Sequence, residues 1–586
     1  MTFHQLITIV VVAFLIVSLY REWFNPSLSF FISAMVLMVA NVITPQELLK
    51  GLSNQQIIII FLLVLVTAGL RMIYGIEFFT KFFSKKLTPK KFLLRMMLIV
   101  SSISAFLNNT PIVAFMIPYV KDWSEKTGNS SSKFLIPLSF ATILGGMITV
   151  IGTSTNLVLN GLIAEYNLPL LGFNDFLYLG IMVTIAGCIY LYFIGYRLLP
   201  DHKESIDTIR QNLKEYIVET LVFKGSQLVG KTVRDAGLRN LQDNFLVEIL
   251  RDDEIISPVA PDEVLKENDL LFFSGNTDSI YSLIREDNGL SIPKQVNLEQ
   301  RGQFNFVEAV VSSRSDLIGM RIKDSDFRNR FNASIIAIHR DGKRVSGKVG
   351  EMHLTGGDFL LLLAGDQVNN ATGIKDLFFL SLPQKINSEK PWWYSWAGGI
   401  SFFILLIGIT GLVPLFTICL ILLTAMVAIG LLNIVEIKRN LDLGLLVLLV
   451  CSLAIGMALE KSGSAQIIAH GLIYSAKSFG PIAALSSLFI VTVFLTSLIA
   501  NAAAVSIMFP IAMSMAEQLT LPYTPFFVTI AFAASCSFMT PIGYQTNLMI
   551  YGPGGYSFRD FVKVGTPLTI IYAIICITFI SFYYNI

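Results

Sequence analysis

Long apolar runs on both sides of a polar centre are the feature of this sequence that most limits its fold. A helix that crosses a membrane needs about 20 mostly apolar residues, and each flank of the 586-residue chain offers five such runs. Only 14% of the residues are charged and 54% are hydrophobic, too few charges to cover the surface of a soluble protein of this size. The sequence predicts an all-α polytopic membrane protein embedded in the lipid bilayer. Its runs lie near 4–20, 28–44, 57–74, 134–164 and 176–199, and near 397–411, 413–435, 442–460, 523–551 and 561–584.

Each flank also contains an apolar stretch that polar residues interrupt at its midpoint. The two stretches are 92–122 and 482–516, and we interpret both as re-entrant hairpins. The expected organisation is a first membrane repeat at 1–200 and a second at 391–586. Each repeat then holds five spanning helices and one hairpin.

The basic loops give the expected orientation, because Lys and Arg accumulate on the cytoplasmic side of a membrane. A cluster of lysines at 81–91 marks one loop as cytoplasmic, and counting spans outward places the polar centre on the same side. Because each flank has an odd number of spans, the second is inserted upside down relative to the first. Such inverted repeats are typical of secondary transporters. We expect a multi-pass protein of the cell (inner) membrane with a cytoplasmic insert.

Two sequence motifs recur in both flanks at matched spacing. Asn109 is followed nine residues later by a proline, and Asn501 is followed at the same distance by another. Gly152 begins Gly-Thr-Ser-Thr-Asn 43 residues after Asn109, and Gly543 begins Gly-Tyr-Gln-Thr-Asn 42 residues after Asn501. This agreement predicts an internal duplication independently of hydropathy.

The motifs place Gly, Pro, Thr and Asn inside apolar segments, which leaves backbone groups unpaired at membrane depth. Such backbone is tolerated only where it lines a cavity or is buried in protein. Helix N-termini there could hold an anion, and backbone carbonyl oxygens could hold a cation. The alternative is that these small residues only pack helices closely.

Charge is missing from the middle of the predicted spans. They contain no Asp or Glu near mid-depth, and Glu460 and Glu517 lie at segment ends. Intramembrane ionisable residues usually mark proton relays, so this absence favours sodium over proton coupling. The flanks show no combination of nucleophile, base and orienting group and no metal cluster, so an enzyme is not expected.

The polar centre, 201–390, contains a duplication of its own with a period of 89 residues. Glu219 pairs with Glu308, Gly230 with Gly319, Arg251 with Arg340 and Asp269 with Asp358. The period predicts two small α/β domains, at 201–295 and 296–390. Their role is either ligand binding or dimer scaffolding. The net charge of +2 gives no reason to expect nucleic acid as a partner.

The motifs resemble those of the divalent anion/sodium symporters. The resemblance is to the branch with two inserted TrkA-C (RCK C-terminal) domains, which is associated with sulfate permeases. It covers nearly the whole chain, through Asn-Asn-Thr-Pro at 108–111, Ile-Gly-Thr-Ser-Thr-Asn at 151–156, Ala-Asn-Ala-Ala-Ala at 500–504 and Thr-Pro-Ile-Gly-Tyr-Gln-Thr-Asn at 540–547. It implies sodium-coupled symport of sulfate or a similar divalent anion by an elevator-type movement, in a homodimer that the inserted domains regulate through a small ligand.

In the family, a Ser-Asn-Thr triplet at each hairpin tip contributes to a sodium site and touches the substrate. This sequence departs from that pattern, with Asn108 in place of the first Ser and alanines on both sides of Asn501. The candidate substrate-binding residues are Asn108, Asn109, Thr110, Thr155, Asn156, Asn501, Thr546 and Asn547. The candidate Na⁺ ligands are Asn109, Gly152, Thr153, Asn156, Asn501, Thr540, Gly543 and Asn547.

Three alternatives remain open at this level. The substrate could be a dicarboxylate, since it is also a compact dianion that helix N-termini could hold. The coupling ion could be a proton. The chain could also be a ligand-gated channel or membrane sensor, as its regulator-like insert would allow.

Overall fold

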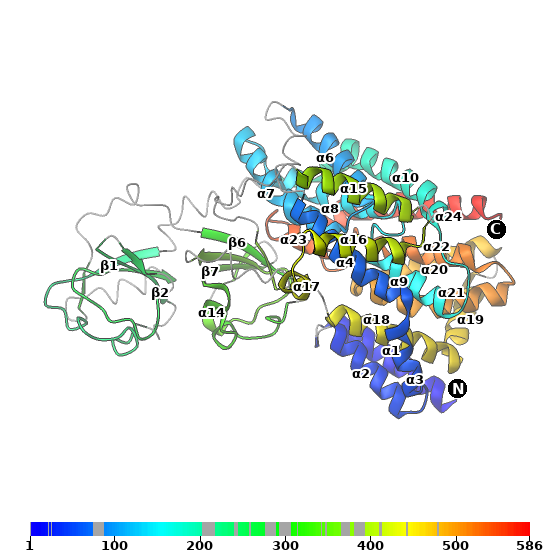
Figure 1. Cartoon of the computed structure of the whole chain (residues 1–586), viewed down its shortest axis with the longest axis horizontal. Coiled ribbons are helices and arrows are strands. Elements are labelled where there is room, and N and C mark those ends of the chain that lie inside the picture. The colour runs from blue at the N-terminus through cyan, green and yellow to red at the C-terminus, as the bar shows by residue number, and fades with distance from the viewer. Residues whose placement is uncertain are drawn as a thin grey trace. The chain divides into compact units, whose positions relative to one another are not determined.

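A computed structural model shows two compact units, which are each described separately. The first unit contains Met1–Asp201, Ser388–Asn547 and Phe558–Ile586, and the second contains His202–Asn387 with Leu548–Ser557. Helices dominate the first unit and strands the second (Figure 1). The structure describes all residues except 1, 22, 25, 74–86, 202–216, 239–243, 253, 257–258, 276–288, 292–305, 313–314, 341–342, 346–348, 365–375, 380–392, 410–412, 441–442 and 477–479.

Some sequence predictions fall on residues that are not described. The domain boundaries at 295/296 and 390/391 lie there, as do Lys81, Lys85 and Lys86 of the predicted cytoplasmic loop. The predicted boundary at 200/201 is one residue from the end of the first segment of the first unit, which ends at Asp201.

The first flank forms a series of apolar helices. Thr44 begins the third of them with a capping box, in which its hydroxyl and the Glu47 carboxylate satisfy each other's backbone N–H groups. The helices are α1 (Phe3–Tyr20), α2 (Pro26–Val39), α3 (Pro45–Ser53), α4 (Gln55–Ile73), α6 (Pro89–Ser104), α7 (Asn109–Thr127), α8 (Leu135–Gly146), α9 (Ser154–Glu165), α10 (Phe173–Tyr190) with a π-helical turn at Leu191–Gly195, and α11 (Tyr196–Leu198).

The second flank repeats much of this order. Asn433 and Glu436 form reciprocal side-chain to backbone hydrogen bonds at the start of a short helix, as Thr44 and Glu47 do in the first flank. The helices are α15 (Trp393–Ile409), α16 (Leu415–Ala428), α17 (Ile434–Asn440), α18 (Leu443–Lys461), α19 (Ser464–Ala476), α20 (Gly480–Leu498), α21 (Asn501–Leu519), α22 (Tyr523–Ala534), α23 (Gln545–Tyr551) and α24 (Phe558–Tyr583).

Six helices of the described part are long and apolar enough to cross a membrane, or seven if a pair bent by 72° between α18 and α19 counts as one span. This supports a polytopic membrane protein. Length and composition do not recover five plain spans per flank, because several apolar runs fold as shorter pieces. The run at 28–44 stops at Asn41 and the run at 413–435 at Gly430, since both residues adopt left-handed backbone conformations that end a helix.

The predicted runs at 134–164 and 523–551 are each broken rather than continuous. The first divides into α8 and α9, separated by 147–153, and the second into α22 and α23, separated by 535–544. The predicted hairpins are likewise pairs of helices, α6 with α7 and α20 with α21. The breaks coincide with the Asn and Gly motifs.

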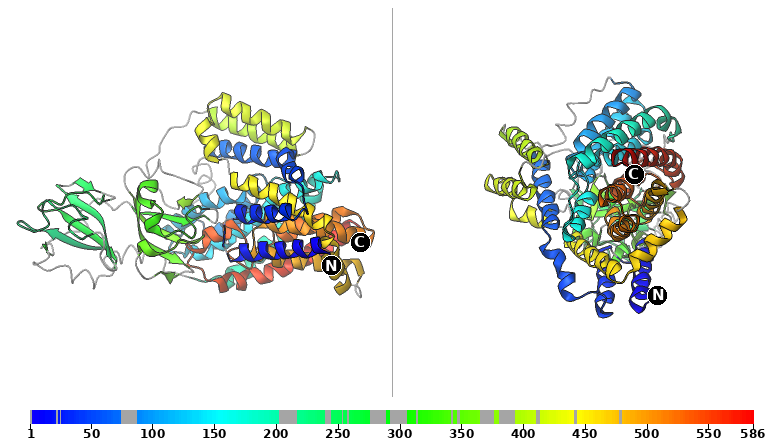
Figure 2. Two further views of the ribbon diagram at one scale, coloured as in Figure 1. Left: turned by 90° about the horizontal axis from the view of Figure 1, so that it is seen from below. Right: turned by 90° about the vertical axis from the view of Figure 1, so that its right-hand side faces the viewer.

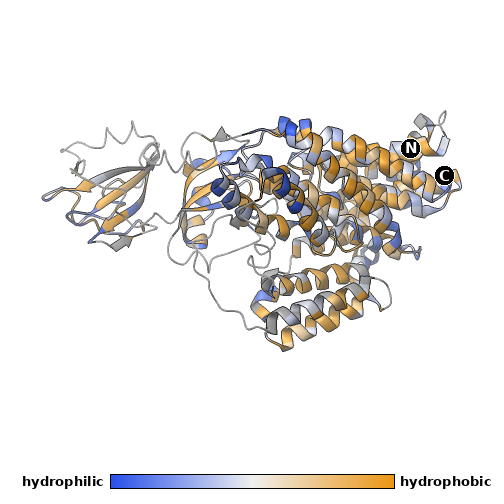
Figure 3. Cartoon of the chain, turned by 90° about the horizontal axis from the view of Figure 1, so that it is seen from above, coloured by the Kyte–Doolittle hydropathy of each residue, from blue (hydrophilic) through white to orange (hydrophobic). Residues whose placement is uncertain are grey.

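Helices of the two flanks pack against one another within the first unit. Helix α2 packs on α18, α4 on α16, and α9 on α21. The blue and cyan helices of the first flank and the yellow to red helices of the second therefore form one body (Figure 2). Hydrophobic residues run along these helices (Figure 3). Some of them, such as Phe403, Phe494 and Ile574, are exposed on the outside of the unit, as expected for side chains that contact lipid.

The second unit contains two five-stranded antiparallel sheets with the same strand order. The orders are β3-β2-β4-β1-β5 and β8-β7-β9-β6-β10. The described residues between 217 and 379 are therefore mainly β, with one short α-helix, α14 (Phe327–Phe331). The strands are β1 (Ile217–Val222), β2 (Asn244–Arg251), β3 (Glu254–Ile256), β4 (Leu270–Gly275), β5 (Leu290–Ser291), β6 (Phe306–Val311), β7 (Ala333–Arg340), β8 (Lys343–Arg344), β9 (Phe359–Ala364) and β10 (Leu377–Phe379).

The residue pairs that define the 89-residue period occupy equivalent positions in these sheets. Gly230 and Gly319 both adopt positive φ. The N–H group of Gly230 donates to the carbonyl oxygen of Leu265, and that of Gly319 donates to the equivalent carbonyl oxygen of Leu354. Each copy also has a β-bulge at the matching place in β2 and β7.

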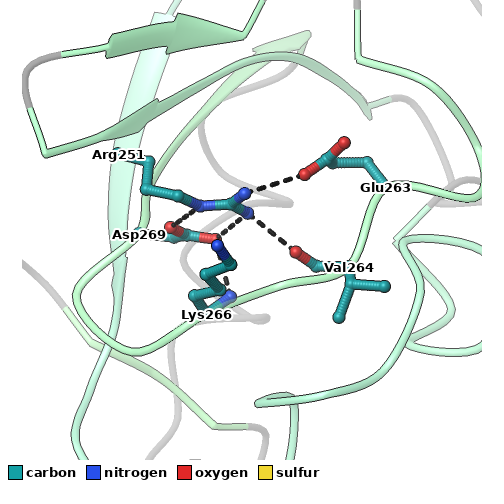
Figure 4. Close-up of polar contacts among 5 residues, drawn as sticks. All are labelled: Arg251, Glu263, Val264, Lys266 and Asp269. Atoms are coloured by element: carbon teal, nitrogen blue, oxygen red, sulfur yellow. Dashed lines mark hydrogen bonds and ion pairs between the residues drawn. The ribbon is translucent and has the colours of Figure 1, made fainter.

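An ion pair with a fully buried Asp links two strands in each copy. Arg251 binds both carboxylate oxygens of Asp269, at 2.8 and 2.9 Å, and also contacts Glu263 and the carbonyl oxygen of Val264 (Figure 4). Arg340 binds Asp358 in the same two-pronged way. The hydrogen bonds that Arg251 donates to Asp269 raise the pKa of its guanidinium further above the usual value. Such paired contacts fix the geometry of the sheet ends.

Candidate functional site

Three long helices of the first unit begin at the repeated motifs. Helix α7 begins at Asn109, α9 at Ser154 and α21 at Asn501. None of the three has a side chain that caps its first-turn N–H groups. Uncapped N–H groups and the helix dipole attract negative charge.

The parts of this site that belong to the first and second flanks are called its first and second halves. In the first half, oxygen atoms from three segments converge around Gly146 and Gly152. Both are buried. A Cβ atom on Gly152 would overlap the carbonyl oxygen of Gly146 and would lie 2.9 Å from that of Ser104. A Cβ atom on Gly146 would lie 2.8 Å from the side-chain oxygen of Asn109. Ser104 and Gly146 are the last residues of α6 and α8, so their carbonyl oxygens belong to helix C-termini.

The second half builds a related arrangement. The carbonyl oxygen of Thr496 would lie 2.7 Å from a Cβ atom on Gly543, just as that of Ser104 lies near Gly152. Thr496 also donates to the amide oxygen of Asn501, as Ser104 does to that of Asn109. The position of Gly146 is taken by Ser537, which lies six residues before Gly543.

Further hydrogen bonds recur in both halves. Asn156 donates to the carbonyl oxygen of Thr149, seven residues earlier, and Asn547 donates to that of Thr540 at the same spacing. The hydroxyl groups of Thr149 and Thr540 in turn bind the backbone just after α6 and near the end of α20. Each broken helix is thus tied to the break between its hairpin helices.

Residues of the second half reach directly into the first-half motif. The Asn109 amide nitrogen donates to the Tyr544 hydroxyl at 2.5 Å, and Thr110 donates to the Gln545 side chain at 3.1 Å. Thr153 lies 3.4 Å from the same Tyr544 hydroxyl. The two halves therefore share one polar cluster.

A second set of contacts joins the halves through Ser139 of α8. Its hydroxyl oxygen lies 2.8 Å from the Thr546 hydroxyl and 2.7 Å from the Asn547 amide oxygen. All three residues are fully buried. Their hydrogen bonds are correspondingly costly to leave unmade.

The cluster consists of neutral side chains and backbone groups. Among the described residues there is no group of three or more His, Cys, Asp or Glu that could hold a metal ion. Uncharged oxygens and helix C-termini suit a monovalent cation, while the helix N-termini suit an anion. The arrangement therefore offers oxygen acceptors suited to a cation and N–H donors suited to an anion without a charged side chain.

The structure places the predicted site residues in two groups. Asn109, Thr110 and Thr153 meet Tyr544 and Gln545, while Thr546 and Asn547 meet Ser139. The Asn501 amide oxygen is bound within its own half. Asn108, Thr155, Asn156, Gly152, Thr540 and Gly543 lie on or beside the helix breaks.

Sequence reasoning missed several members of the cluster. Tyr544 and Gln545 lie inside the repeated motif but differ from Thr153 and Ser154 of the first copy, so matching alone passed over them. Ser104 and Thr496 each precede the motif asparagine by five residues, and this shared hydroxyl spacing could have identified them. Ser139 carries no comparable signal.

Comparison with known proteins matches this chain mainly to membrane transporters. The sequence profile of the family described as "Citrate transporter" (CitMHS) matches residues 12–415 and 401–585. A Synechocystis protein named "Uncharacterized transporter sll0640" is 32% identical over 96% of this chain and 95% of its own length. The "Putative sulfur deprivation response regulator" of Chlamydomonas reinhardtii is 31% identical over 95% and 97%. The "Sodium/sulfate cotransporter 2" of the same alga is 24% identical over 96% and 88%.

Proposed function

Because this chain belongs to the citrate transporter (CitMHS) family, we propose that it is a sodium-coupled symporter of sulfate or a similar divalent anion. The shared polar cluster at Asn109 and Tyr544 carries the proposal. It joins both halves, it is built from neutral oxygen and nitrogen groups, and it lies where uncapped helices begin. The name of a relative as a sodium/sulfate cotransporter supports the choice of ions.

The proposed roles follow from the chemistry of each group. The first-turn N–H groups of α7, α9 and α21, with the side chains of Asn108, Thr110 and Thr155, hold the anion. Asn109, Gly152, Thr153 and Asn156 offer oxygen atoms to Na⁺ beside it. A bound cation offsets the charge of the anion, which a site without charged side chains cannot do itself.

The proposal includes an architecture. The two flanks are inverted repeats, as the hydrogen bonds at matched spacings support. The broken helices and hairpins move together as an elevator against the remaining helices, in a homodimer of the inner membrane. The insert, in the cytoplasm, consists of two TrkA-C-like domains that regulate transport on binding a small ligand.

Two observations favour other functions of the same fold. The family is described as citrate transporters, so a di- or tricarboxylate is a competing substrate. One relative is named as a sulfur deprivation response regulator, which keeps a membrane sensor in consideration. A proton-coupled transporter of the same anions is the third alternative.

Uptake into liposomes that contain the purified protein separates these functions. We expect radiolabelled sulfate to accumulate when an inward sodium gradient is imposed and not when an equal proton gradient replaces it. Proton-driven uptake alone would remove sodium from the proposal. Uptake of citrate or a dicarboxylate but not of sulfate would change the substrate, and the lack of any uptake would favour the sensor.

A further inference from the structure

The two halves of the polar cluster differ at one position beside the motif asparagine. In the first half this position is Gly146, and in the second half it is Ser537. The surrounding residues match, since Ser104 corresponds to Thr496 and Asn109 to Asn501. The difference is therefore a serine hydroxymethyl group inside an otherwise repeated frame.

In the first half the Asn109 amide oxygen accepts from one hydroxyl group, that of Ser104. A side chain at Gly146 would collide with the Asn109 amide, at 2.8 Å from the oxygen and 3.1 Å from the nitrogen. Gly146 therefore packs directly against that amide and brings no donor to it. Carbonyl oxygens from the ends of α6 and α8 lie against the neighbouring Gly152, and oxygens of this kind are typical sodium ligands in transporters.

The second half has a hydroxyl donor at the equivalent position. Ser537 is fully buried and donates to the Asn501 amide oxygen at 3.2 Å. The Thr496 hydroxyl lies 2.9 Å from the same oxygen. Ser537 therefore supplies this oxygen with a donor of its own, besides the Thr496 hydroxyl, whose single proton is shared with the carbonyl oxygen of Ala534 at 2.7 Å.

A second difference between the halves points the same way. The amide oxygen of Asn156 is fully buried and has no hydrogen-bond partner among the described residues. The equivalent oxygen of Asn547 accepts from Ser139 at 2.7 Å. A buried acceptor without a donor is costly, and a cation would satisfy it. The first half therefore lacks donors where the second half has them.

We infer that the chain binds one coupling cation, in the first half, and that the Ser537 hydroxyl takes the place of a cation in the second. This inference rests on the proposed sodium coupling. It assigns no cation to the second predicted ligand set, Asn501, Thr540, Gly543 and Asn547. Those residues then act in holding the broken helix rather than in coupling.

Equilibrium binding of radiolabelled sodium to the purified, substrate-free protein in lipid nanodiscs tests the inference. We expect one sodium ion per chain at saturation. Asn109→Ala should lose this binding, whereas the matched variant Asn501→Ala should keep one ion with affinity changed by no more than about twofold. Gly146→Ser, which introduces the second-half side chain into the first half, should also abolish binding. Thermal unfolding of each variant checks that it is folded.

Other outcomes have distinct meanings. Two ions per chain, or loss of sodium binding in folded Asn501→Ala, would overturn the inference while sodium-driven uptake left the proposed function standing. Binding that survives in both Asn109→Ala and Gly146→Ser would also overturn it. If neither sodium binding nor sodium-driven uptake is found, both the inference and the proposed coupling fail.

Discussion

Replacing Tyr544 with phenylalanine tests whether the contact between the two halves organises the substrate site. The change removes the hydroxyl that accepts from the Asn109 amide at 2.5 Å and leaves its shape almost intact. Asn109 is 1% exposed, so its donor loses a partner that water cannot replace. An unsatisfied buried donor costs about 1–3 kcal/mol. If only the arrangement seen here binds the anion, this cost lowers the fraction of protein in the binding-competent arrangement. The value of kcat/KM for uptake should then fall by the same factor, about fivefold to 150-fold.

Initial rates of sodium-driven sulfate uptake into liposomes measure this loss. Tyr572→Phe is the matched control, because its hydroxyl is also buried and donates to the carbonyl oxygen of Phe532 in α22 at 3.1 Å rather than to a motif residue. It should lower stability without changing kcat/KM. An unchanged kcat/KM in folded Tyr544→Phe, or an equal decrease in both variants, would refute the reasoning.

Three further predictions concern the site and the insert. Asn156→Ala should abolish uptake while the protein stays folded, because its amide ties α9 to the break; normal uptake would show that the site is misplaced. Asp269→Asn should weaken the first sheet by about 1–3 kcal/mol, since a largely buried Arg251 loses its bidentate carboxylate and keeps only the single ion pair with Glu263. Hydrogen exchange of β4 in the full-length protein measures this. Asp262→Asn, whose ion pair is exposed, should change exchange little, and an equal effect would contradict the burial argument. Removal of 201–390 should alter regulation or dimer stability, as uptake with and without added ligands and light scattering would show. A changed substrate profile would contradict a modular insert.

Sequence patterns predicted the membrane class and the location of the polar motifs because both depend on local composition. Apolar runs and their interruptions are properties of neighbouring residues. The 89-residue period similarly predicted the equivalence of Arg251 with Arg340, since a duplicated ion pair requires the same residue types at the same spacing. These features needed no knowledge of distant contacts.

Other features depend on contacts that sequence spacing does not encode. Tyr544 meets Asn109 across 435 positions of the chain, and Ser139 meets Asn547 across 408. The lengths of α2 and α16 depended on single left-handed residues, Asn41 and Gly430, which a hydropathy window averages away. The helix break within 134–164 could not be predicted from hydropathy either. The glycines of this run do not lower its hydropathy much, and they matter because other backbone segments approach them closely.

The neutral lining of the polar cluster has a consequence for membrane voltage. An empty carrier with such a lining brings no charged side chain of the site across the field, so its return step is insensitive to potential. A carrier loaded with a divalent anion and one sodium ion has one net negative charge, and a potential of 100 mV acts on that charge with about 2.3 kcal/mol. An inside-negative potential would therefore slow inward transport of a dianion and leave transport of a monovalent anion unaffected.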